Sequence, residues 1–287
     1  MNGTNTTPLA TSLHQNHFQE HQNKETPAGA VMICASAFGA DYVRQHGQAS
    51  LIERISTAGA QGIEIREELL TERDYPLAKL GEAIRHARLK CVYSAAHPLF
   101  DSHGEPDFEH IDQTLARAAE LGAQLVKVGL GHLSSTNIET GARTLLAHLH
   151  DNVLPVTIEN DQTPCGGDPL IHAALHRALR EDATLNCSIS ATLDLGNGHW
   201  TGHDLSLAAS RLGQYVGYVH CKAVCHDRGR LIVCVPDDAT LEHWSRLWQH
   251  LPPSALRAIE FPLDPEDAES QALQVARLHT LPLALTS

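Results

Sequence analysis

The sequence alternates short β-type runs with amphipathic helical stretches, and eight such units follow one another from near residue 30. A clear helical stretch covers 107–122, where Phe108, Ile111 and Leu115 share one face and Gly122 suits the end. Near-continuous apolar strands separated by helices indicate a parallel sheet, and the count of eight favours a closed barrel. The expected strands cover 30–37, 62–68, 91–96, 125–131, 156–160, 191–196, 218–223 and 258–263. We therefore predict an α/β fold with a single (β/α)₈ TIM barrel as the catalytic domain at 29–287.

Residues 1–28 differ from the rest because they are polar and show no β/α alternation. A secretory signal would need a basic segment followed by an apolar one, and neither is present there. We expect a disordered or loosely packed N-terminal tail. No run of about 18 apolar residues occurs in the chain, so we expect no membrane span and no membrane partner.

Charge and cysteine content narrow the class of protein further. The net charge of −13 disfavours broad electrostatic binding to nucleic acid. Seven cysteines, with no spacing typical of disulfide frameworks or zinc ribbons, favour a reduced, cytoplasmic protein. No glycine-rich nucleotide fingerprint follows a predicted strand. The partner that remains is a small molecule.

Each of the last four predicted strands carries one late polar side chain: Glu159, Asp194, His220 and Glu260. Their chain neighbours are apolar or small, and side chains along a strand alternate between its two faces. If the apolar neighbours pack outward against helices, the four polar groups point into the barrel. The carboxyl ends of the strands are where TIM barrels carry their catalytic groups. The sequence thus predicts that these four side chains share one space at the barrel mouth.

Three carboxylates and an imidazole in one such space would repel one another or be poorly solvated without a cation. A divalent metal ion removes this conflict. An oxygen-rich donor set with one nitrogen suits Mn²⁺, Mg²⁺ or Co²⁺, and Zn²⁺ or Fe²⁺ is also compatible. The alternative is four isolated, salt-bridged residues at strand ends. Four such residues on consecutive strands, at matching positions, favour one divalent metal.

Basic side chains are expected at the same mouth. Lys222 has the inward parity of the strand-seven histidine, Lys127 comes late in the fourth strand, and Arg66 lies two residues after Glu64 in the second. A carboxylate or phosphate on a substrate would give these cations partners. Equally, they could do no more than balance the inward acids.

Two histidines are further candidates for substrate binding. His97 in "AAHP" and His199 in "GNGHW" follow predicted strands and could hydrogen-bond hydroxyl groups of a small molecule, or could lie at the surface. The turn-rich segment 160–169 could form a rim over the pocket. Segment 223–231 could add polar groups to the mouth, or could be an ordinary turn around Gly229.

The strand-end segments "TIEN", "LDLGN", "VHCKA" and "AIEFP" resemble those of the xylose isomerase-like barrels over about residues 30–280. That group includes sugar isomerases, ketose 3-epimerases, inosose dehydratases and, more distantly, endonuclease IV. Within it, the segments "FGADYVRQHGQ", "EIREELL" and "VHCKAV" look like those of sugar phosphate isomerase/epimerase proteins of bacterial sugar-acid catabolism. The resemblance implies the same metal ligands, namely Glu159, Asp194, His220 and Glu260.

Two positions depart from the pattern of the epimerases. Asn197 stands where many members have a histidine, three residues after the strand-six aspartate, and the nearest histidine is His199. Ala223 stands where many have an aspartate, three residues after the strand-seven histidine. Both changes spare the metal ligands but leave the substrate and the reaction type open.

These residues predict an isomerase or epimerase of a keto-sugar, sugar phosphate or sugar acid that works by proton transfer through a metal-stabilised enediolate. Glu159 and Glu260 would be its acid and base, as well as metal ligands. A dehydratase in the same fold is the nearest alternative. An endonuclease IV-like phosphodiesterase and a non-catalytic sugar-binding barrel are further ones. The oligomeric state is open, with a homodimer as one option.

Overall fold

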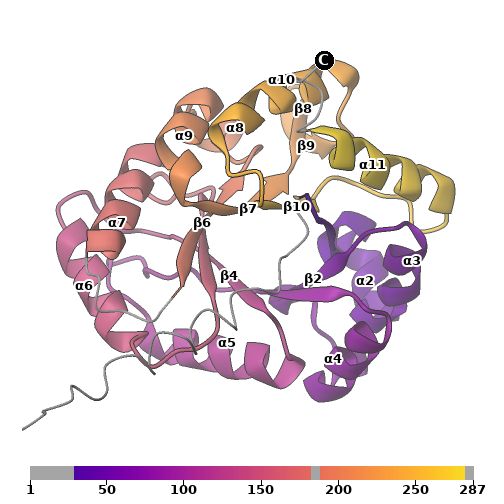
Figure 1. The fold of residues 1–287 in the computed structure, drawn as a ribbon, viewed down its shortest axis with the longest axis horizontal. Helices are drawn as coiled ribbons and strands as arrows, with labels where there is room; N and C mark the ends of the chain where they lie inside the picture. Colours follow the sequence, from indigo (N-terminus) through magenta and orange to yellow (C-terminus); the bar gives the residue numbers. More distant parts are fainter. Residues whose placement is uncertain (1–28, 182–187, 282–287) are drawn as a thin grey trace, which may run out of the picture.

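In the computed structural model, which describes residues 29–181 and 188–281, eight parallel strands close into a barrel as the sequence predicted (Figure 1). Neighbouring strands follow the order β1-β10-β7-β6-β5-β4-β3-β2, and β2 returns to β1. The barrel strands are β1 (Val31–Cys34), β2 (Gly62–Arg66), β3 (Lys90–Ser94), β4 (Leu125–Gly129), β5 (Val156–Glu159), β6 (Ile189–Asp194), β7 (Val216–Cys221) and β10 (Leu256–Ile259).

The helices surround the barrel and cover the outer face of its strands (Figure 1). Aspartates begin several of them; for example, Asp107 accepts a hydrogen bond from the backbone N–H of His110, and Asp204 from that of Leu207. The α-helices are α2 (Ala40–His46), α3 (Ile52–Thr57), α4 (Leu77–His86), α5 (Phe108–Leu121), α6 (Ile138–His148), α7 (Pro169–Glu181), α8 (Gly198–Thr201), α9 (Leu205–Leu212), α10 (Asp238–Leu247) and α11 (Ala268–Thr280). Short 3₁₀ helices are η1 (Ala35–Phe38), η2 (Gln48–Leu51), η3 (Glu67–Leu69), η4 (Glu72–Asp74), η5 (Gly213–Tyr215) and η6 (Trp248–His250).

The core has two compartments, separated by the strands themselves. Outward side chains such as Ile33, Ile158 and Val219 pack with the helices in one large apolar cluster. Inward side chains fill a much smaller apolar layer, made of Met32, Cys34, Val92, Tyr218 and Ala258. Polar inward side chains therefore lie directly above a dry layer, where their charges are poorly screened.

The predicted strands begin at or within two residues of the observed starts, but they end too late. For example, 30–37 was expected where β1 ends at Cys34, and 258–263 where β10 ends at Ile259. In both places the chain leaves the sheet once it reaches the mouth, and apolar residues there pack under loops instead. The polar residues at the strand ends therefore lie at the mouth of the barrel, as the alternation of side chains along each strand predicted.

Segment 223–231 is more ordered than a simple turn. It belongs to an antiparallel hairpin of β8 (Ala223–Asp227) and β9 (Arg230–Cys234), which follows β7 directly. Arg228 and Gly229 both have positive φ, at 47° and 78°, as a two-residue hairpin turn requires. In the sequence, the "RG" pair flanked by β-type residues is the signal for this hairpin.

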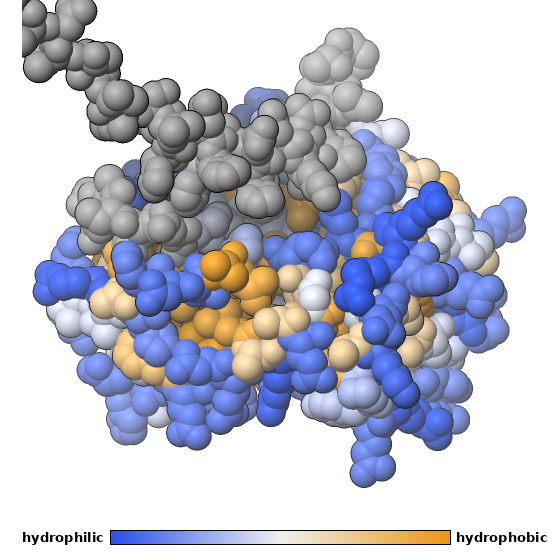
Figure 2. Space-filling view, turned by 60° about the horizontal axis from the view of Figure 1, so that its bottom comes forward, coloured by the Kyte–Doolittle hydropathy of each residue, from blue (hydrophilic) through white to orange (hydrophobic). Residues whose placement is uncertain are grey.

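The surface in Figure 2 is largely hydrophilic around a limited hydrophobic area. Within residues 29–181 and 188–281, no helix combines the length and apolar character needed to cross a membrane. The expected tail at 1–28 lies outside the described residues.

Candidate metal centre

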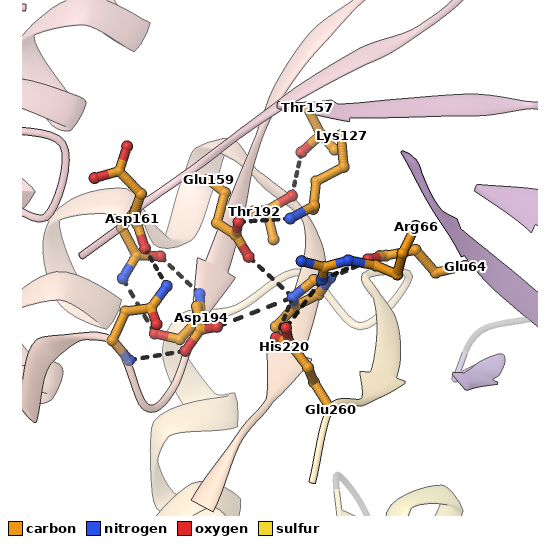
Figure 3. Close-up of polar contacts among 12 residues, drawn as sticks. Glu64, Arg66, Lys127, Thr157, Glu159, Asp161, Thr192, Asp194, His220 and Glu260 are labelled. Carbon is orange, nitrogen blue, oxygen red and sulfur yellow. Dashed lines mark hydrogen bonds and ion pairs between the residues drawn. The ribbon is translucent and has the colours of Figure 1, made fainter. Parts of the chain in front are cut away.

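Four neighbouring strands bring the predicted ligands to one point at the mouth (Figure 3). Glu159 and Asp194 are the last residues of β5 and β6, and His220 is the penultimate residue of β7. Strand pairing sets Asp194 beside His220, and His220 beside Ala258 of β10. Glu260 follows two residues after Ala258 and so has the same inward parity.

The donor atoms of these four residues all lie within 4.8 Å of one another. His220 Nδ1 is the common neighbour, at 2.7 Å from Glu260 Oε2, 2.9 Å from Glu159 Oε1 and 3.9 Å from Asp194 Oδ2. His220 and Asp194 are fully buried, while Glu159 and Glu260 each keep 10% of their side-chain surface exposed. The site is thus dry beneath and open only through the two glutamates.

The other ring nitrogen of His220, Nε2, is held in place by residues deeper in the barrel. Nε2 lies 2.8 Å from Glu64 Oε2, and the Tyr218 hydroxyl donates to the same oxygen at 2.9 Å. Glu64 therefore holds the proton on Nε2 and leaves Nδ1 as the atom that faces the carboxylates. This is the carboxylate–histidine arrangement that orients histidine ligands in metal sites. Burial alone would raise the pKa of Glu64, but His220 and Lys127 lower it to about 2.

The two carboxylate oxygens of Asp194 differ: Oδ1 accepts backbone hydrogen bonds, and Oδ2 is available to bind a metal ion. Its Oδ1 accepts hydrogen bonds from the backbone N–H groups of Gly196 and Asn197, at 2.7 and 2.8 Å. Its Oδ2 is buried and has no hydrogen bond of good geometry, although the Lys222 ammonium lies 2.8 Å away. Burial raises the pKa of Asp194 to about 6 despite that ammonium. An orphaned, buried carboxylate oxygen aimed at three other donors fits a metal ligand.

The two glutamates are held ionised by basic neighbours. Lys127 Nζ lies 2.6 Å from Glu159 Oε2, and Arg66 Nη1 lies 3.0 Å from Glu260 Oε1. Burial opposes ionisation of both carboxyls, but Lys127 and His220 lower the pKa of Glu159, and Lys222 and His220 lower that of Glu260. Four predicted substrate-binding residues, Glu64, Arg66, Lys127 and Lys222, therefore do join the ligand cluster.

Two cavities open beside this cluster. One, of about 650 Å³, is lined by residues of α8 and the loop after it, of β8 and of α10, including His199, His203, His243 and Lys222. The other, of about 470 Å³, lies between the ends of β1 and β10 and is lined by Ser36, Lys222, Val233 and Glu260, among others. Each has room for a small sugar-sized molecule next to the candidate ligands.

No family model and no curated protein sequence matches this chain. Solved structures do match it. A xylose isomerase domain-containing protein from Salmonella typhimurium LT2 superposes with a TM-score of 0.65 at 13% identity, over 89% of this chain and 98% of that one. The chain shares the TIM-barrel fold of this xylose isomerase domain-containing protein.

Proteins with this fold carry out different reactions. An L-ribulose 3-epimerase matches with a TM-score of 0.59 at 16% identity, over 88% of this chain and 92% of that one. A probable 3-DHS dehydratase from Bacillus anthracis matches with a TM-score of 0.58 at 12% identity, over 88% and 98%. An AP endonuclease from Brucella melitensis shares the fold as well. At these identities the likeness establishes the fold, and the activity must be argued from the site.

Asn197, which departs from the epimerase pattern of xylose isomerase-like barrels, has a defined place here. Its side chain donates to the backbone oxygen of Asn160 at 2.8 Å, and its Oδ1 accepts from Gln162 at 3.0 Å and from Lys222 at 3.2 Å. Asn160 in turn clasps Asp194, accepting from its N–H at 2.6 Å and donating to its carbonyl at 3.1 Å. The two asparagines therefore fix the ends of β5 and β6 relative to each other.

We expect Asn160→Ala to weaken Mn²⁺ affinity about 10-fold, because the spacing of two ligands loses its support. Loss of two buried hydrogen bonds should also lower the free energy of unfolding by about 2 kcal/mol. Calorimetric Mn²⁺ titration and urea denaturation measure the two effects. Asn152 makes a similar clasp to Leu154 in the loop before β5, with bonds of 2.6 and 3.2 Å. Asn152→Ala should therefore change stability alone, and equal Mn²⁺ affinity in both variants would contradict the positioning role of Asn160.

The predicted histidines have different positions. His199 lines the larger cavity, beside Lys222. His97 instead contacts His110 of α5, with ring centroids 4.2 Å apart and the rings tilted by 38°, outside the ligand cluster. A loop after β3 carries it away from the axis, which parity arguments cannot follow once the strand has ended.

Sequence reasoning missed the residues beneath and beside the ligands. Tyr218 and Cys34 were not singled out, yet Cys34 belongs with Glu64 and His220 to a second group of potential metal donors. The inward parity of Tyr218 and its position two residues before His220 were available signals. Asn160 directly follows a predicted ligand, but its role depends on a partner in the next strand.

Proposed function

We propose that this protein is a divalent-metal-dependent isomerase or epimerase that moves a proton on a carbon next to the carbonyl of a sugar, sugar phosphate or sugar acid. The observation that carries the proposal is the convergence of Glu159, Asp194, His220 and Glu260 beside two cavities at the barrel mouth. One of these residues alone would not support the proposal, because isolated polar groups at strand ends are common.

The donor set fits a hard or borderline dication. It offers three carboxylates and one imidazole nitrogen, which suits Mn²⁺, Mg²⁺ or Co²⁺ and also admits Zn²⁺. The orphaned Asp194 oxygen and the oriented His220 nitrogen both support this assignment. When bound, such an ion supplies Lewis acidity that polarises a carbonyl and makes the neighbouring C–H more acidic.

Glu159 and Glu260 are placed for the proton transfer itself. β6 and β7 lie between their strands, so the two carboxylates reach the imidazole of His220 from different sides. One glutamate, ionised, takes the proton from one face of the substrate carbon. The other is also ionised in the free site, so it first takes up a proton from water and then delivers it to the opposite face. The two glutamates have exchanged protonation states at the end of an epimerisation. Delivery to the adjacent carbon instead gives isomerisation.

The rival functions differ in what they need from the site. A dehydratase would begin with the same proton removal and then lose a β-hydroxyl, so only the product separates it. An endonuclease IV-like enzyme needs a multi-metal cluster with more histidines. His97 contacts His110 of α5 and His226 is exposed on the hairpin, so neither joins the four candidate ligands. The net charge of −13 also disfavours DNA as the substrate.

The test is a panel of keto-sugars, sugar phosphates and sugar acids in deuterated water with added Mn²⁺, followed by proton NMR. We expect at least one substrate to exchange a single carbon-bound proton for deuterium, and EDTA to stop the exchange. Appearance of a dehydrated product would favour the dehydratase. Absence of exchange with every substrate, in the presence of Mn²⁺, Mg²⁺, Co²⁺ and Zn²⁺ in turn, would refute the proposal.

A further inference from the structure

Lys222 occupies the centre of the mouth rather than its edge. Its Nζ lies 2.8 Å from Asp194 Oδ2 and 3.1 Å from Glu260 Oε2, and it donates to Asn197 Oδ1 at 3.2 Å. Only 10% of its side chain is exposed. The two carboxylate oxygens that it contacts are the same atoms that face the other candidate ligands.

Gly196 leaves space for the side chain of Lys222. A Cβ at Gly196 would lie 2.7 Å from Lys222 Cγ and 2.9 Å from its Cδ, so glycine at that position lets the lysine pass. Lys222 also lines both cavities described above. A molecule that enters either one therefore meets the same ammonium group.

The balance of charge around the ligands points to what that molecule carries. Glu64, Glu159, Asp194 and Glu260 face three basic side chains, those of Arg66, Lys127 and Lys222. When a dication is bound, His220 ligates it as the neutral imidazole, so the four carboxylates, the three basic side chains and the dication together leave one positive charge in excess. Glu68 also contacts Arg66, but 38% of its side chain is exposed and water screens it.

A bound metal ion would share the carboxylate partners of Lys222, but not those of the other two basic side chains to the same extent. The contacts of Lys222, Asp194 Oδ2 and Glu260 Oε2, are donor atoms of the cluster, whereas Lys127 is paired with Glu159 Oε2, which does not face His220 Nδ1. Arg66 keeps contacts to Glu64 and Glu68 in addition to Glu260. A buried ammonium that shares its carboxylates needs a further anionic partner.

We propose that Lys222 is a specificity-determining residue that binds an anionic group, a carboxylate or a phosphate, of the substrate. The inference rests on the proposed function and deepens it, since it selects sugar acids and sugar phosphates over neutral sugars. The excess positive charge of the loaded site favours the anion at long range, and the ammonium gives it a charged hydrogen bond at contact.

Three probes distinguish the forms of the substrate. D-Fructose and 2-keto-D-gluconate share an α-hydroxy ketone, but the second has a carboxylate in place of a hydroxymethyl group. D-Fructose 6-phosphate carries its charge at the other end of the molecule. Calorimetric titration of the Mn²⁺-loaded protein should show at least one of the two anions binding about 10- to 100-fold tighter than fructose, and the one that does identifies the anionic group.

Lys222→Met should remove most of that preference, while Lys222→Arg should keep much of it, because Arg retains the charge. Lys222→Met should also bind Mn²⁺ several-fold tighter in the absence of any sugar, since a competing cation has gone. Lys79→Met, an exposed lysine on α4, is the matched control and should leave both measurements unchanged.

Two results would overturn the inference while leaving the proposed function standing: fructose bound as tightly as both anions, or an unchanged preference in Lys222→Met. A protein that bound no Mn²⁺ and catalysed no proton exchange would instead refute the proposed function, and with it this inference.

Discussion

Glu260→Gln should lose at least about 10³-fold in the rate of substrate proton exchange with solvent, the largest effect expected of a single substitution here. The amide has nearly the shape of the carboxylate and keeps one oxygen as a ligand, but it cannot accept the substrate proton. Glu260 contacts His220 at 2.7 Å, Arg66 at 3.0 Å and Lys222 at 3.1 Å, so its position is fixed by three neighbours. Those neighbours hold it as the ionised carboxylate that a base must be.

The measurement is deuterium incorporation by NMR, with the Mn²⁺ content of each variant determined in parallel. A variant that keeps its metal but loses exchange separates the loss of the base from the loss of the ion. Glu139→Gln, an exposed carboxylate at the start of α6, is the matched control and should exchange at the wild-type rate. Exchange at an undiminished rate in Glu260→Gln would remove this residue from the acid/base role.

His220→Ala should weaken Mn²⁺ binding by more than about 100-fold, because it removes the one nitrogen donor and the anchor around which the carboxylates are arranged. His220 Nδ1 lies close to both glutamates, at 2.7 Å from Glu260 and 2.9 Å from Glu159. Without it, the remaining carboxylates would repel one another in a buried space. Elemental analysis after dialysis and Mn²⁺ titration calorimetry both report this loss.

Glu64→Gln provides a graded second variant, because it leaves all four ligands in place. It disturbs only the contact with His220 Nε2, at 2.8 Å, and should weaken Mn²⁺ binding by about 10- to 100-fold. His86→Ala, an exposed histidine at the end of α4, controls for the loss of an imidazole elsewhere. Retention of Mn²⁺ by His220→Ala at the wild-type level would contradict the ligand assignment.

Periodicity was sufficient for the fold because it reports a local property that every strand repeats. Apolar strands such as those that contain Ile158 and Val219 must be buried on both faces of the sheet. Helices with one apolar face must therefore cover them. The same parity placed Glu159, Asp194, His220 and Glu260 on the inner face, since alternation along a strand is fixed by backbone geometry. The structure places all four there.

Parity failed where the strands end. His97 has left the sheet and contacts His110. The hairpin of β8 and β9 lies where the sequence suggested either polar groups for the mouth or an ordinary turn. Beyond the last ladder hydrogen bond, the direction of a side chain depends on what the loop packs against, and no local period encodes that.

Short-range alternation and residue type are enough to predict the eight-stranded barrel and the set of candidate ligands. They do not predict how these groups contact one another. The clasp of Asn160 on Asp194, the support of His220 by Glu64, and the place of Lys222 between two carboxylates all link separate strands. Such contacts depend on the register and closure of the barrel, which fix distances between residues that are remote in the chain.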